Sequence, residues 1–387
     1  MNVLFVHQSS EMYGSDKVLL YLADGLRSAG KVHPVVILPD DGPLYSALVS
    51  KGIEVHVGEV AKISRAAFTP RGLFALVSQV VRSVRNIDKI LKGRSIDIVH
   101  SNTLAVLSGA AWAFARGKRH LWHVHEIILK PSIISKGFPI LVDLFSNRVI
   151  SNSTMTERWL LSERARLVSR STVVFNGLPE VQQPTESSID SFRDSVGAGP
   201  SDVVVTLAGR INRWKGQELL VEAASVLKRT GRFSGLRFVV VGSAAPGMES
   251  LPAQLQAKAV AEGVDKSFSF ISFVDDVWPV WFGSDIAVVP STEPEPFGMV
   301  AIEAMAAGLP VIAAAHGGLL DIVVEGRTGI LFSPGNAVAL ADAIGTLAAD
   351  RDCRARFGEA GARRQRDVFS VDAQVESTSR VYEEIVA

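Results

Sequence analysis

The sequence has little cysteine and no long hydrophobic run. Cys353 is the single cysteine among 387 residues, which excludes an internal disulfide and favours the reducing cytoplasm. No stretch reaches the roughly 18–20 uncharged apolar residues that a membrane-spanning helix needs. The first residues have no charged leader and turn polar at His7-Gln8, so we expect no secretory signal.

Net charge is also absent, because 40 Lys and Arg residues balance 40 Asp and Glu residues. This balance argues against bulk binding of nucleic acid. The charges are nevertheless unevenly placed: residues 1–180 contain 22 basic and 14 acidic residues, a formal +8, and the remainder carries −8. The asymmetry predicts two domains with different surfaces, the first of them suited to an anionic contact.

Short apolar runs alternate with helical patterns along the whole chain. Most are rich in Val and Ile and apolar on both faces, which is typical of parallel strands covered by helices on both sides. One sheet of about thirteen strands would be unusually large, so the pattern favours two doubly wound α/β sheets. The predicted strands are 3–6, 35–38, 54–57, 96–100, 120–124, 149–152, 172–175, 203–208, 237–241, 268–270, 286–289, 311–314 and 330–332.

A Pro-, Gln- and Ser-rich stretch marks the domain boundary. We expect a first Rossmann-like domain over residues 1–180, a linker over 181–200 and a second domain over 201–368. Residues 351–387 read as two helices broken near Phe369-Ser370, with Ser370 capping the last one. Ligands of such sheets bind where the strands end and helices begin, so two facing domains predict an interdomain cleft.

The most informative segment follows the strand at 286–289. It reads Glu293-Pro-Glu295-Pro-Phe-Gly298, and a helix that starts at Gly298 would carry Glu303 on its second turn. Carboxylates here can accept hydrogen bonds from sugar hydroxyls while helix-start amides bind phosphate. The alternative is a pair of ordinary acids stabilised by the helix dipole.

A second segment follows the strand at 203–208. Gly209-Arg210 and Lys215-Gly216 place two cations at the mouth of the sheet, beside a helix start. A planar guanidinium and a compact ammonium suit a diphosphate. Taken alone, an Arg and a Lys at this spacing are also compatible with solvated surface charge.

These two segments together resemble the retaining glycosyltransferases of family 4 (group 1), which have the GT-B fold of two Rossmann-like domains. The resemblance implies that Arg210 and Lys215 bind the donor diphosphate, Glu303 the ribose hydroxyls and Glu295 the transferred sugar. It also implies a last helix, 369–387, that packs back on the first domain. Further matching pieces are 239–242, 285–291, 308–312 and 326–329.

The same resemblance assigns two loops of the second domain. Ser272, Phe273 and Val274 would lie by the nucleotide base, although the family usually has Gly at position 272. The backbone amides that would meet the sugar and the distal phosphate are those of Phe297, Gly298, Met299 and Val300. His316-Gly317-Gly318 matches a glycine turn, with Asp321 where Glu is commoner.

The first domain matches more loosely. Gly14 stands where the family often has paired glycines, and Asp16 stands where the family often has Glu. His125, at the end of the strand at 120–124, fits the family's active-site histidine that contacts the donor sugar. A metal held by His120, His123 and His125 is disfavoured because strand alternation puts His120 on the opposite face.

The resemblance therefore implies a metal-independent, retaining hexosyltransferase that needs no cofactor. It would move a sugar from a nucleotide-diphosphate sugar to a hydroxyl of a glycan or lipid-linked acceptor, in assembly of bacterial surface polysaccharide such as lipopolysaccharide. The set with catalytic roles is His125, Arg210, Lys215 and Glu295. The alternatives are a nucleotide-sugar epimerase or hydrolase on the same fold, and a non-catalytic sugar-nucleotide-binding protein.

A peripheral membrane contact is a further expectation for this basic half. Residues 73–91 form an amphipathic helix pattern with basic neighbours, and Lys130 and Lys136 lie among apolar residues after His125. One interpretation is a helix packed on the sheet, and the other is docking on the anionic inner face of the cell membrane. The apolar positions of the pattern are Leu73, Leu76, Val77, Val80, Val84, Ile87 and Leu91.

Overall fold

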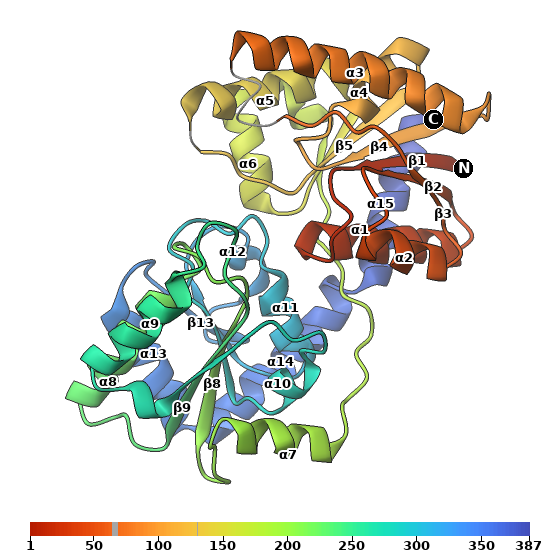
Figure 1. The fold of residues 1–387 in the computed structure, drawn as a ribbon. Coiled ribbons are helices and arrows are strands. Elements are labelled where there is room, and N and C mark those ends of the chain that lie inside the picture. Colours follow the sequence, from red (N-terminus) through yellow and green to blue (C-terminus); the bar gives the residue numbers. More distant parts are fainter. Residues whose placement is uncertain (64–68, 130) are drawn as a thin grey trace. The chain divides into compact units, whose positions relative to one another are not determined.

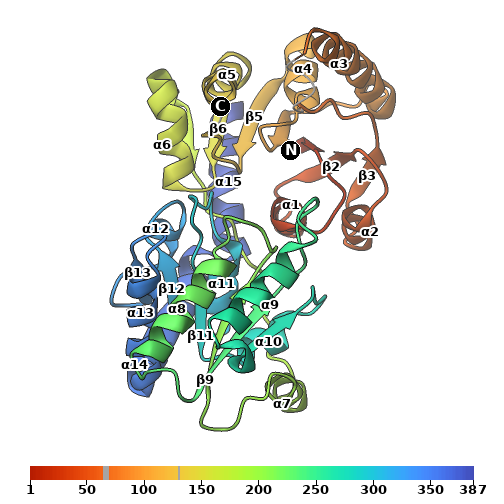
Figure 2. The same cartoon turned by 60° about the vertical axis from the view of Figure 1, so that its left-hand side comes forward.

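The computed structural model describes residues 1–63, 69–129 and 131–387, and the chain divides into two compact units (Figure 1). Unit 1 comprises Met1–Pro179 and Phe369–Ala387, and unit 2 comprises Glu180–Val368. Each unit contains one parallel sheet with helices on both faces, seen from a second direction in Figure 2. The predicted α/β class with two doubly wound sheets is thus confirmed.

Unit 1 contains a parallel sheet of seven strands in the described part of the chain, in the order β3-β2-β1-β4-β5-β6-β7. Each predicted run of the first half overlaps one of these strands, with ends that differ by up to two residues. Their buried Val, Ile and Leu residues point to both faces, as expected for strands covered on both sides. The strands are β1 (Asn2–His7), β2 (His33–Leu38), β3 (Glu54–Val57), β4 (Ile98–Asn102), β5 (Arg119–Val124), β6 (Arg148–Ser151) and β7 (Ser171–Val173).

Two groups of helices cover the faces of this sheet. On one face, Phe5 packs with Leu19 of α1 (Gly14–Ser28), Leu48 of α2 (Pro43–Ser50) and Tyr382 of α15 (Val371–Val386). The other face is covered by α3 (Pro70–Leu91), α4 (Ser108–Arg116), α5 (Ser132–Phe145) and α6 (Thr154–Glu163), and a 3-10 turn follows at Ala165–Ser169. Among the described residues, no helix combines the length and apolar character required to cross a membrane.

Unit 2 repeats the arrangement with six strands in the order β10-β9-β8-β11-β12-β13. One face packs against α8 (Gln217–Arg229), α9 (Leu251–Ala261) and α13 (Ala337–Ala349), and α11 (Met299–Ala306), α12 (Leu319–Ile322) and α14 (Arg351–Val368) lie on the other. The short α10 (Trp278–Phe282) precedes β11, and a 3-10 turn at Asp265–Ser267 precedes β10. The strands are β8 (Val203–Ala208), β9 (Leu236–Val241), β10 (Phe268–Ile271), β11 (Ile286–Val289), β12 (Val311–Ala314) and β13 (Gly329–Phe332).

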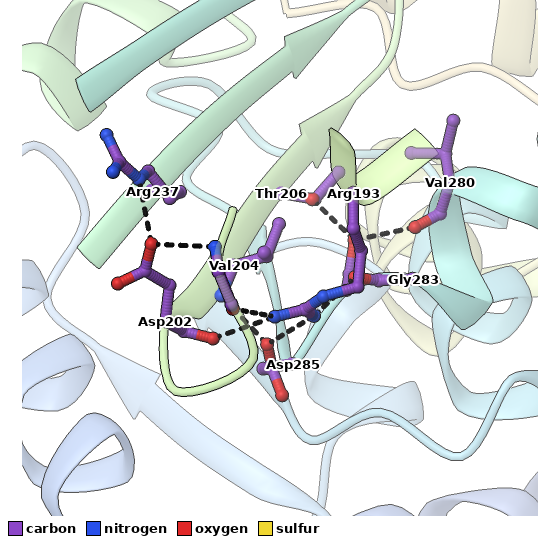
Figure 3. Close-up of polar contacts among 10 residues, drawn as sticks. Arg193, Asp202, Val204, Thr206, Arg237, Val280, Gly283 and Asp285 are labelled. Atoms are coloured by element: carbon purple, nitrogen blue, oxygen red, sulfur yellow. Dashed lines mark hydrogen bonds and ion pairs between the residues drawn. The ribbon is translucent and has the colours of Figure 1, made fainter. Parts of the chain in front are cut away.

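The expected linker over 181–200 contains a helix, α7 (Glu186–Ser195), which belongs to unit 2. The Thr185 side chain caps it by accepting a hydrogen bond from the Ser188 amide. Figure 3 shows how Arg193 ties α7 to the start of the sheet: its guanidinium donates to the Gly283 carbonyl at 2.9 Å and pairs with Asp285 at 3.2 Å. The sequence of this segment suggests a linker because Arg193 is surrounded by polar residues, which give no sign of its contacts with the sheet.

The C-terminal break falls where the sequence placed it. Helix α14 ends at Val368, and the Ser370 side chain caps α15 by accepting from the Ala373 amide. Phe369 is fully buried, and Leu178 exchanges backbone hydrogen bonds with the chain at 369–371. Helix α15 therefore belongs to unit 1, although α14 belongs to unit 2.

Candidate functional site

In unit 2, the loop after β8 is shaped by one side chain and one glycine. The Asn212 side-chain oxygen accepts hydrogen bonds from the amides of Trp214 (3.1 Å) and Lys215 (2.9 Å). Gly216 then begins α8 at a φ of 80°, where a Cβ would lie 2.0 Å from the Pro290 carbonyl oxygen. Only glycine fits this close approach to the end of β11. Lys215 is thereby fixed directly before the first turn of α8.

Lys215 and Glu295 are brought together from two separate loops. The Lys215 ammonium donates to Glu295 Oε1 at 2.5 Å and lies 4.5 Å from the centre of the Trp214 ring. The Ser291 hydroxyl donates to the same carboxylate oxygen at 2.7 Å. Glu295 is buried, so a partner for its charge is required. Two residues assigned separately from the sequence thus form one ion pair at the ends of β8 and β11.

The backbone around Glu295 is held by the turn at 316–318. The Gly318 amide donates to the Glu295 carbonyl at 2.7 Å, and the His316 side chain donates to the Ser291 carbonyl at 2.8 Å. A Cβ on Gly317 would lie 2.3 Å from the Glu295 carbonyl oxygen. The glycine turn noted in the sequence therefore packs directly against the Glu295 loop and sets its conformation.

Helix α11 begins as the sequence predicted. Gly298 is its N-cap at a φ of 118°, where a Cβ would lie 2.8 Å from a side-chain carbon of Leu319. Glu303 lies on the second turn and is half-buried. Phe297 is buried, whereas Met299 and Val300 are half-buried at the helix start. The first-turn amides of α11, which have no carbonyl partner four residues earlier within the helix, are close in sequence to the buried Glu295.

The remaining predicted residues of unit 2 also lie at the ends of strands. Arg210 is exposed in the loop after β8, and its carbonyl accepts from the Gln217 side chain at 3.2 Å. Ser272, Phe273 and Val274 follow β10, and the Phe273 amide donates to the Ser243 hydroxyl at 3.2 Å. These loops follow β8 and β10, which β9 separates, and so lie at the carboxyl edge of one parallel sheet, where such sheets bind ligands.

In unit 1, Gly14 is the first residue of α1 and is exposed. A Cβ at this position would meet no heavy atom within 4 Å, so the fold itself does not require glycine here. Asp16 is buried two residues later. Its carboxylate accepts from the Tyr13 amide at 2.9 Å and contacts His7 Nε2 at 2.6 Å. The acid at position 16 therefore has a partner that the sequence did not suggest.

His125 lies just beyond β5 and is buried. Its Nε2 is 2.9 Å from the side-chain oxygen of Asn102, and its ring centre is 4.0 Å from that of His123. Burial, reinforced by the nearby His123 and His7, holds the pKa of His125 well below its usual range, so the ring is neutral at pH 7. His120 instead contacts Ser101 and the Phe145 carbonyl on the other face, which confirms the predicted alternation.

Glu126, next to His125 in the sequence, is held by two backbone amides. The Glu126 carboxylate accepts from the amides of Leu104 (3.1 Å) and His125 (3.2 Å). Burial raises the pKa of Glu126. Over residues 1–63, 69–129 and 131–387, no group of three or more His, Cys, Asp or Glu side chains is arranged to hold a metal ion.

Sequence reasoning missed three residues that contact the predicted ones. His7 and Asn102 end strands β1 and β4 and contact each other, with Nδ1 of His7 3.0 Å from the Asn102 amide nitrogen. Ser291 ends the segment after β11 and holds Glu295. A polar residue at the last position of a buried parallel strand, or within two residues after it, is the signal that could have found all three.

Two family models match the chain. The model described as "Glycosyl transferases group 1" matches residues 188–364, and the model described as "Glycosyltransferase Family 4" matches residues 13–180. A D-inositol 3-phosphate glycosyltransferase of Corynebacterium glutamicum is 34% identical over 227 residues, which cover 58% of this chain and 53% of that protein. The chain thus spans about half the length of this curated relative.

Solved structures of one protein are similar along the whole chain. The crystal structure of Anabaena HepE in complex with UDP is 25% identical, has a TM-score of 0.83, and the match covers 99% of this chain and 100% of that one. The structure of the same protein in complex with UDP-glucose gives 25% identity, a TM-score of 0.82 and the same coverage. With matches to both family models on two parallel-sheet Rossmann-like units, the chain belongs to the family 4, group 1 glycosyltransferases of GT-B fold.

Proposed function

We propose that this protein transfers a sugar from a nucleotide-diphosphate sugar to a hydroxyl group of an acceptor. The observation that carries the proposal is the ion pair of the half-buried Lys215 with the buried Glu295, beside the starts of two helices. A cation and helix-start amides suit the phosphates of a donor, and a carboxylate suits sugar hydroxyls. Membership of the family and the similarity to HepE with bound UDP-glucose support the same reading.

The proposed chemistry follows from where charge develops. Breaking the bond between sugar and phosphate places negative charge on the diphosphate and positive charge on the sugar. Arg210, Lys215 and the start of α11 stabilise the leaving diphosphate, and this stabilisation grows toward the transition state. These positive groups support a reaction that uses no metal. Glu303 holds the ribose, and His125 contacts the transferred sugar.

Retention of configuration is part of the proposal. Glu295 Oε1 already accepts hydrogen bonds from both Lys215 and Ser291, so this oxygen is stabilised as an anion and is a poor nucleophile. We therefore favour attack by the acceptor hydroxyl from the face that the leaving group departs, without a covalent intermediate. Proton NMR of the first-formed product distinguishes the anomers, and an inverted product would contradict this step.

The donor is proposed to be a UDP-sugar, because the HepE structures contain UDP and UDP-glucose. A ligand that binds only the folded protein raises its midpoint of thermal unfolding. We expect UDP to raise that midpoint more than GDP, ADP or dTDP at equal concentration. A larger shift with any of the other three would assign the base differently.

The activity test compares two glutamates of one segment. Glu303→Ala removes the proposed ribose contact and is expected to lower kcat/KM for transfer by about 10²-fold. Glu293→Ala, at an exposed position two residues before Glu295, is the matched control and is expected to keep the wild-type rate. Equal rates in the two variants would contradict the assignment.

The same assay separates the alternative functions. A transferase consumes donor in step with acceptor, a hydrolase releases free sugar without acceptor, and an epimerase converts the donor itself. Binding of UDP-sugar with no product in any reaction would indicate a sugar-nucleotide-binding protein. We expect consumption to depend on the acceptor.

For the acceptor we propose a hydroxyl of a glycan or lipid-linked glycan in surface-polysaccharide assembly. The curated relatives are named for D-inositol 3-phosphate, which is the second acceptor to test because it also offers ring hydroxyls. Product analysis by mass spectrometry with each acceptor decides between them. Transfer to D-inositol 3-phosphate alone would replace the polysaccharide assignment.

Peripheral docking of unit 1 on an anionic membrane is the last part of the proposal. The second half of α3 packs into the core through Ile87 and Leu91, as expected for a helix packed on the sheet. The first half presents apolar side chains to the surface instead: those of Leu73, Phe74, Val77 and Val81 are 45–78% exposed. Lys130 lies outside the described residues.

Charge near this apolar stripe favours an anionic surface. Arg71, Arg85 and Lys89 are exposed on α3, and Phe114 is exposed on the adjacent α4. An apolar face with basic neighbours is typical of interfacial helices.

We expect the protein to float with phosphatidylglycerol vesicles at low salt, and we expect a Leu73→Ser/Phe74→Ser variant to lose this binding. Val168→Ser, at an exposed apolar position elsewhere in unit 1, is the control. Wild-type protein that stays with the unbound fraction would contradict docking.

A further inference from the structure

Four polar side chains of unit 1 form a continuous chain of contacts at the carboxyl edge of its sheet. Asp16 contacts His7 at 2.6 Å, His7 contacts the Asn102 side chain at 3.0 Å, and Asn102 contacts His125 at 2.9 Å. His7, Asn102 and His125 come from the ends of β1, β4 and β5, which are neighbours in the sheet. Asp16 is added by the first turn of α1.

All four side chains are buried, none of them more than 8% exposed. Buried polar groups are costly unless each finds a hydrogen-bond partner. Residues that merely filled the space could be apolar at no such cost. Three strand ends and the first turn of α1 thus bring together four buried polar side chains, each of which has a hydrogen-bond partner within the group.

In the series of contacts from Asp16 to His125, the donor and the acceptor of each hydrogen bond can be assigned. The Asp16 carboxylate only accepts, so Nε2 of His7 donates to it, and Nδ1 of His7 lies 3.0 Å from the Asn102 side-chain nitrogen and 3.1 Å from the Asn102 backbone carbonyl oxygen. The Asn102 amide group donates to that Nδ1, which turns its oxygen toward His125. That oxygen only accepts, so Nε2 of His125 carries a proton. Nδ1 of the neutral His125 ring is then its hydrogen-bond acceptor.

The other neighbours of His125 fix its plane without setting its proton. The His123 ring packs against it, His123 Nδ1 is 3.2 Å from His100 Nε2, and His100 Nδ1 is 2.7 Å from the Tyr382 hydroxyl. The series His123, His100 and Tyr382 thus contacts His125 only through the packing of the His123 ring. Asn102 is the described side chain within hydrogen-bond distance of a His125 ring nitrogen.

We propose that Asp16, His7 and Asn102 are positioning residues that lock His125 in its Nε2-protonated tautomer, so that the ring offers Nδ1 to a hydroxyl of the bound sugar. The ligand step rests on the proposed glycosyl transfer, whereas the tautomer lock does not depend on it. A fixed tautomer spares the enzyme the cost of rearranging a proton when the ligand arrives.

The informative substitution is Asp16→Asn. The Tyr13 amide needs an acceptor, so the oxygen of the new side chain faces Tyr13 and its NH₂ group faces His7. His7 Nε2 must then accept, its proton moves to Nδ1, and the Asn102 carbonyl at 3.1 Å takes that proton's hydrogen bond. The Asn102 NH₂ group loses its acceptor, and its amide is free to turn. His125 should become a mixture of the two tautomers.

The test uses the full-length protein labelled with ¹⁵N at histidine. Two-bond ¹H–¹⁵N correlations report which ring nitrogen carries the proton, and His125→Gln identifies the signals of His125. We expect Nε2 protonation in the wild type and a tautomer mixture in Asp16→Asn. Asp24→Asn, on the same helix but at a partly exposed ion pair with Lys51, should leave the His125 signals unchanged.

A second pair of variants guards against misfolding. Asn102→Asp keeps an acceptor for His125 Nε2 and should keep its tautomer, whereas Asn102→Leu removes the acceptor and should not. In transfer assays, Asp16→Asn is expected to lower kcat at least about tenfold while KM for the donor stays within about twofold. Nδ1 protonation in the wild type, or an unchanged His125 in both Asp16→Asn and Asn102→Leu, would overturn the lock. A folded wild type without any transferase activity would count against the proposed function instead.

Discussion

Units 1 and 2 share a strand order but place different chemistry at the carboxyl edges of their sheets. In each, the first strand lies inside the sheet, with the second and third strands on one side and the fourth and later strands on the other. In unit 1 this edge carries buried histidines, and burial lowers the pKa of His100, His123 and His125. In unit 2 it carries an ion pair and loops shaped by glycine.

The difference shows that one scaffold supports two ways of preparing a polar site. In unit 1, burial keeps the rings of His100, His123 and His125 neutral, which depends on pH. Unit 2 keeps charge and balances it with an opposite charge and backbone amides, which depends on loop geometry. Substitutions and acid should therefore affect the two units differently, and four predictions test this contrast.

The largest expected effect is on the charged site. Lys215→Ala leaves the buried Glu295 without its cation and removes the ammonium proposed to bind the donor diphosphate, and should lower kcat by about 10²–10³-fold. Steady-state kinetics with purified, folded protein measures it. Arg213→Ala, at an exposed position of the same loop, should remain close to wild type. Comparable losses in both variants would mean that overall loop charge, and not the pair, matters.

Acid should destabilise unit 1 before unit 2. Burial lowers the pKa of His120 to about 4, so between its ordinary value of 6.5 and 4 the unfolded chain binds a proton that the folded one does not. Stability therefore falls as pH falls through this window, by up to about 3 kcal/mol for this side chain. The buried His100, His123 and His125 act in the same direction.

Pulsed hydrogen exchange with mass spectrometry, after incubation in urea at pH 7.5 and at pH 5, reports each unit separately. All pulses are given at one pH so that intrinsic exchange rates match. His120→Gln should reduce the pH dependence of unit 1, since an amide can contact both Ser101 and the Phe145 carbonyl without titrating. Earlier loss of protection in unit 2 on acidification would break the contrast.

Loop geometry is tested at Gly216. Gly216→Ala combines a positive φ with a Cβ 2.0 Å from the Pro290 oxygen, so it should destabilise unit 2 by more than about 1 kcal/mol and weaken UDP binding. Gly335→Ala has a similar φ of 73° but no atom within 4 Å of its Cβ, and isolates the cost of the backbone angle. Urea unfolding and calorimetric titration with UDP measure both effects. Identical results for the two would remove the role of the close approach.

The smallest effect is expected from Ser291→Ala. It removes one hydrogen bond to Glu295 and leaves the Lys215 contact in place, which should cost about 1 kcal/mol, or roughly a fivefold fall in kcat. Thr346→Ala, which removes a hydroxyl bonded within α13, should have no effect on the rate. A loss in Ser291→Ala as large as that in Lys215→Ala would show that the hydroxyl, and not the ammonium, governs Glu295.

The sequence predicted the strands well because each is a short apolar run that the fold buries on both faces. The start of α11 at Gly298 and the cap at Ser370 were predictable from local rules. Contacts between distant segments were not. Lys215 and Glu295 are 80 residues apart, and each was assigned to a ligand without any sign that they bind each other.

The residues behind the candidate site were the hardest to predict. His7 and Asn102 differ from ordinary polar strand ends only through their partners, which lie on other strands. Helix α7 was missed because its single deeply packed residue, Phe192, and its anchor Arg193 are surrounded by Ser, Asp and Glu. In both cases the deciding interactions span tens of residues, which local patterns do not record.

Unit 1 is discontinuous along the chain, and this has a consequence for its synthesis. Residues of α15, Tyr382 and Ile385 among them, belong to the core that includes Phe5 and Leu19. A ribosome makes all of unit 2 before it makes α15. Part of the apolar core of unit 1 therefore stays uncovered until α15 has been translated. Unit 2 can fold as soon as its own residues emerge. Unit 1 is thus the first of the two units to be started by the ribosome and the last to be completed.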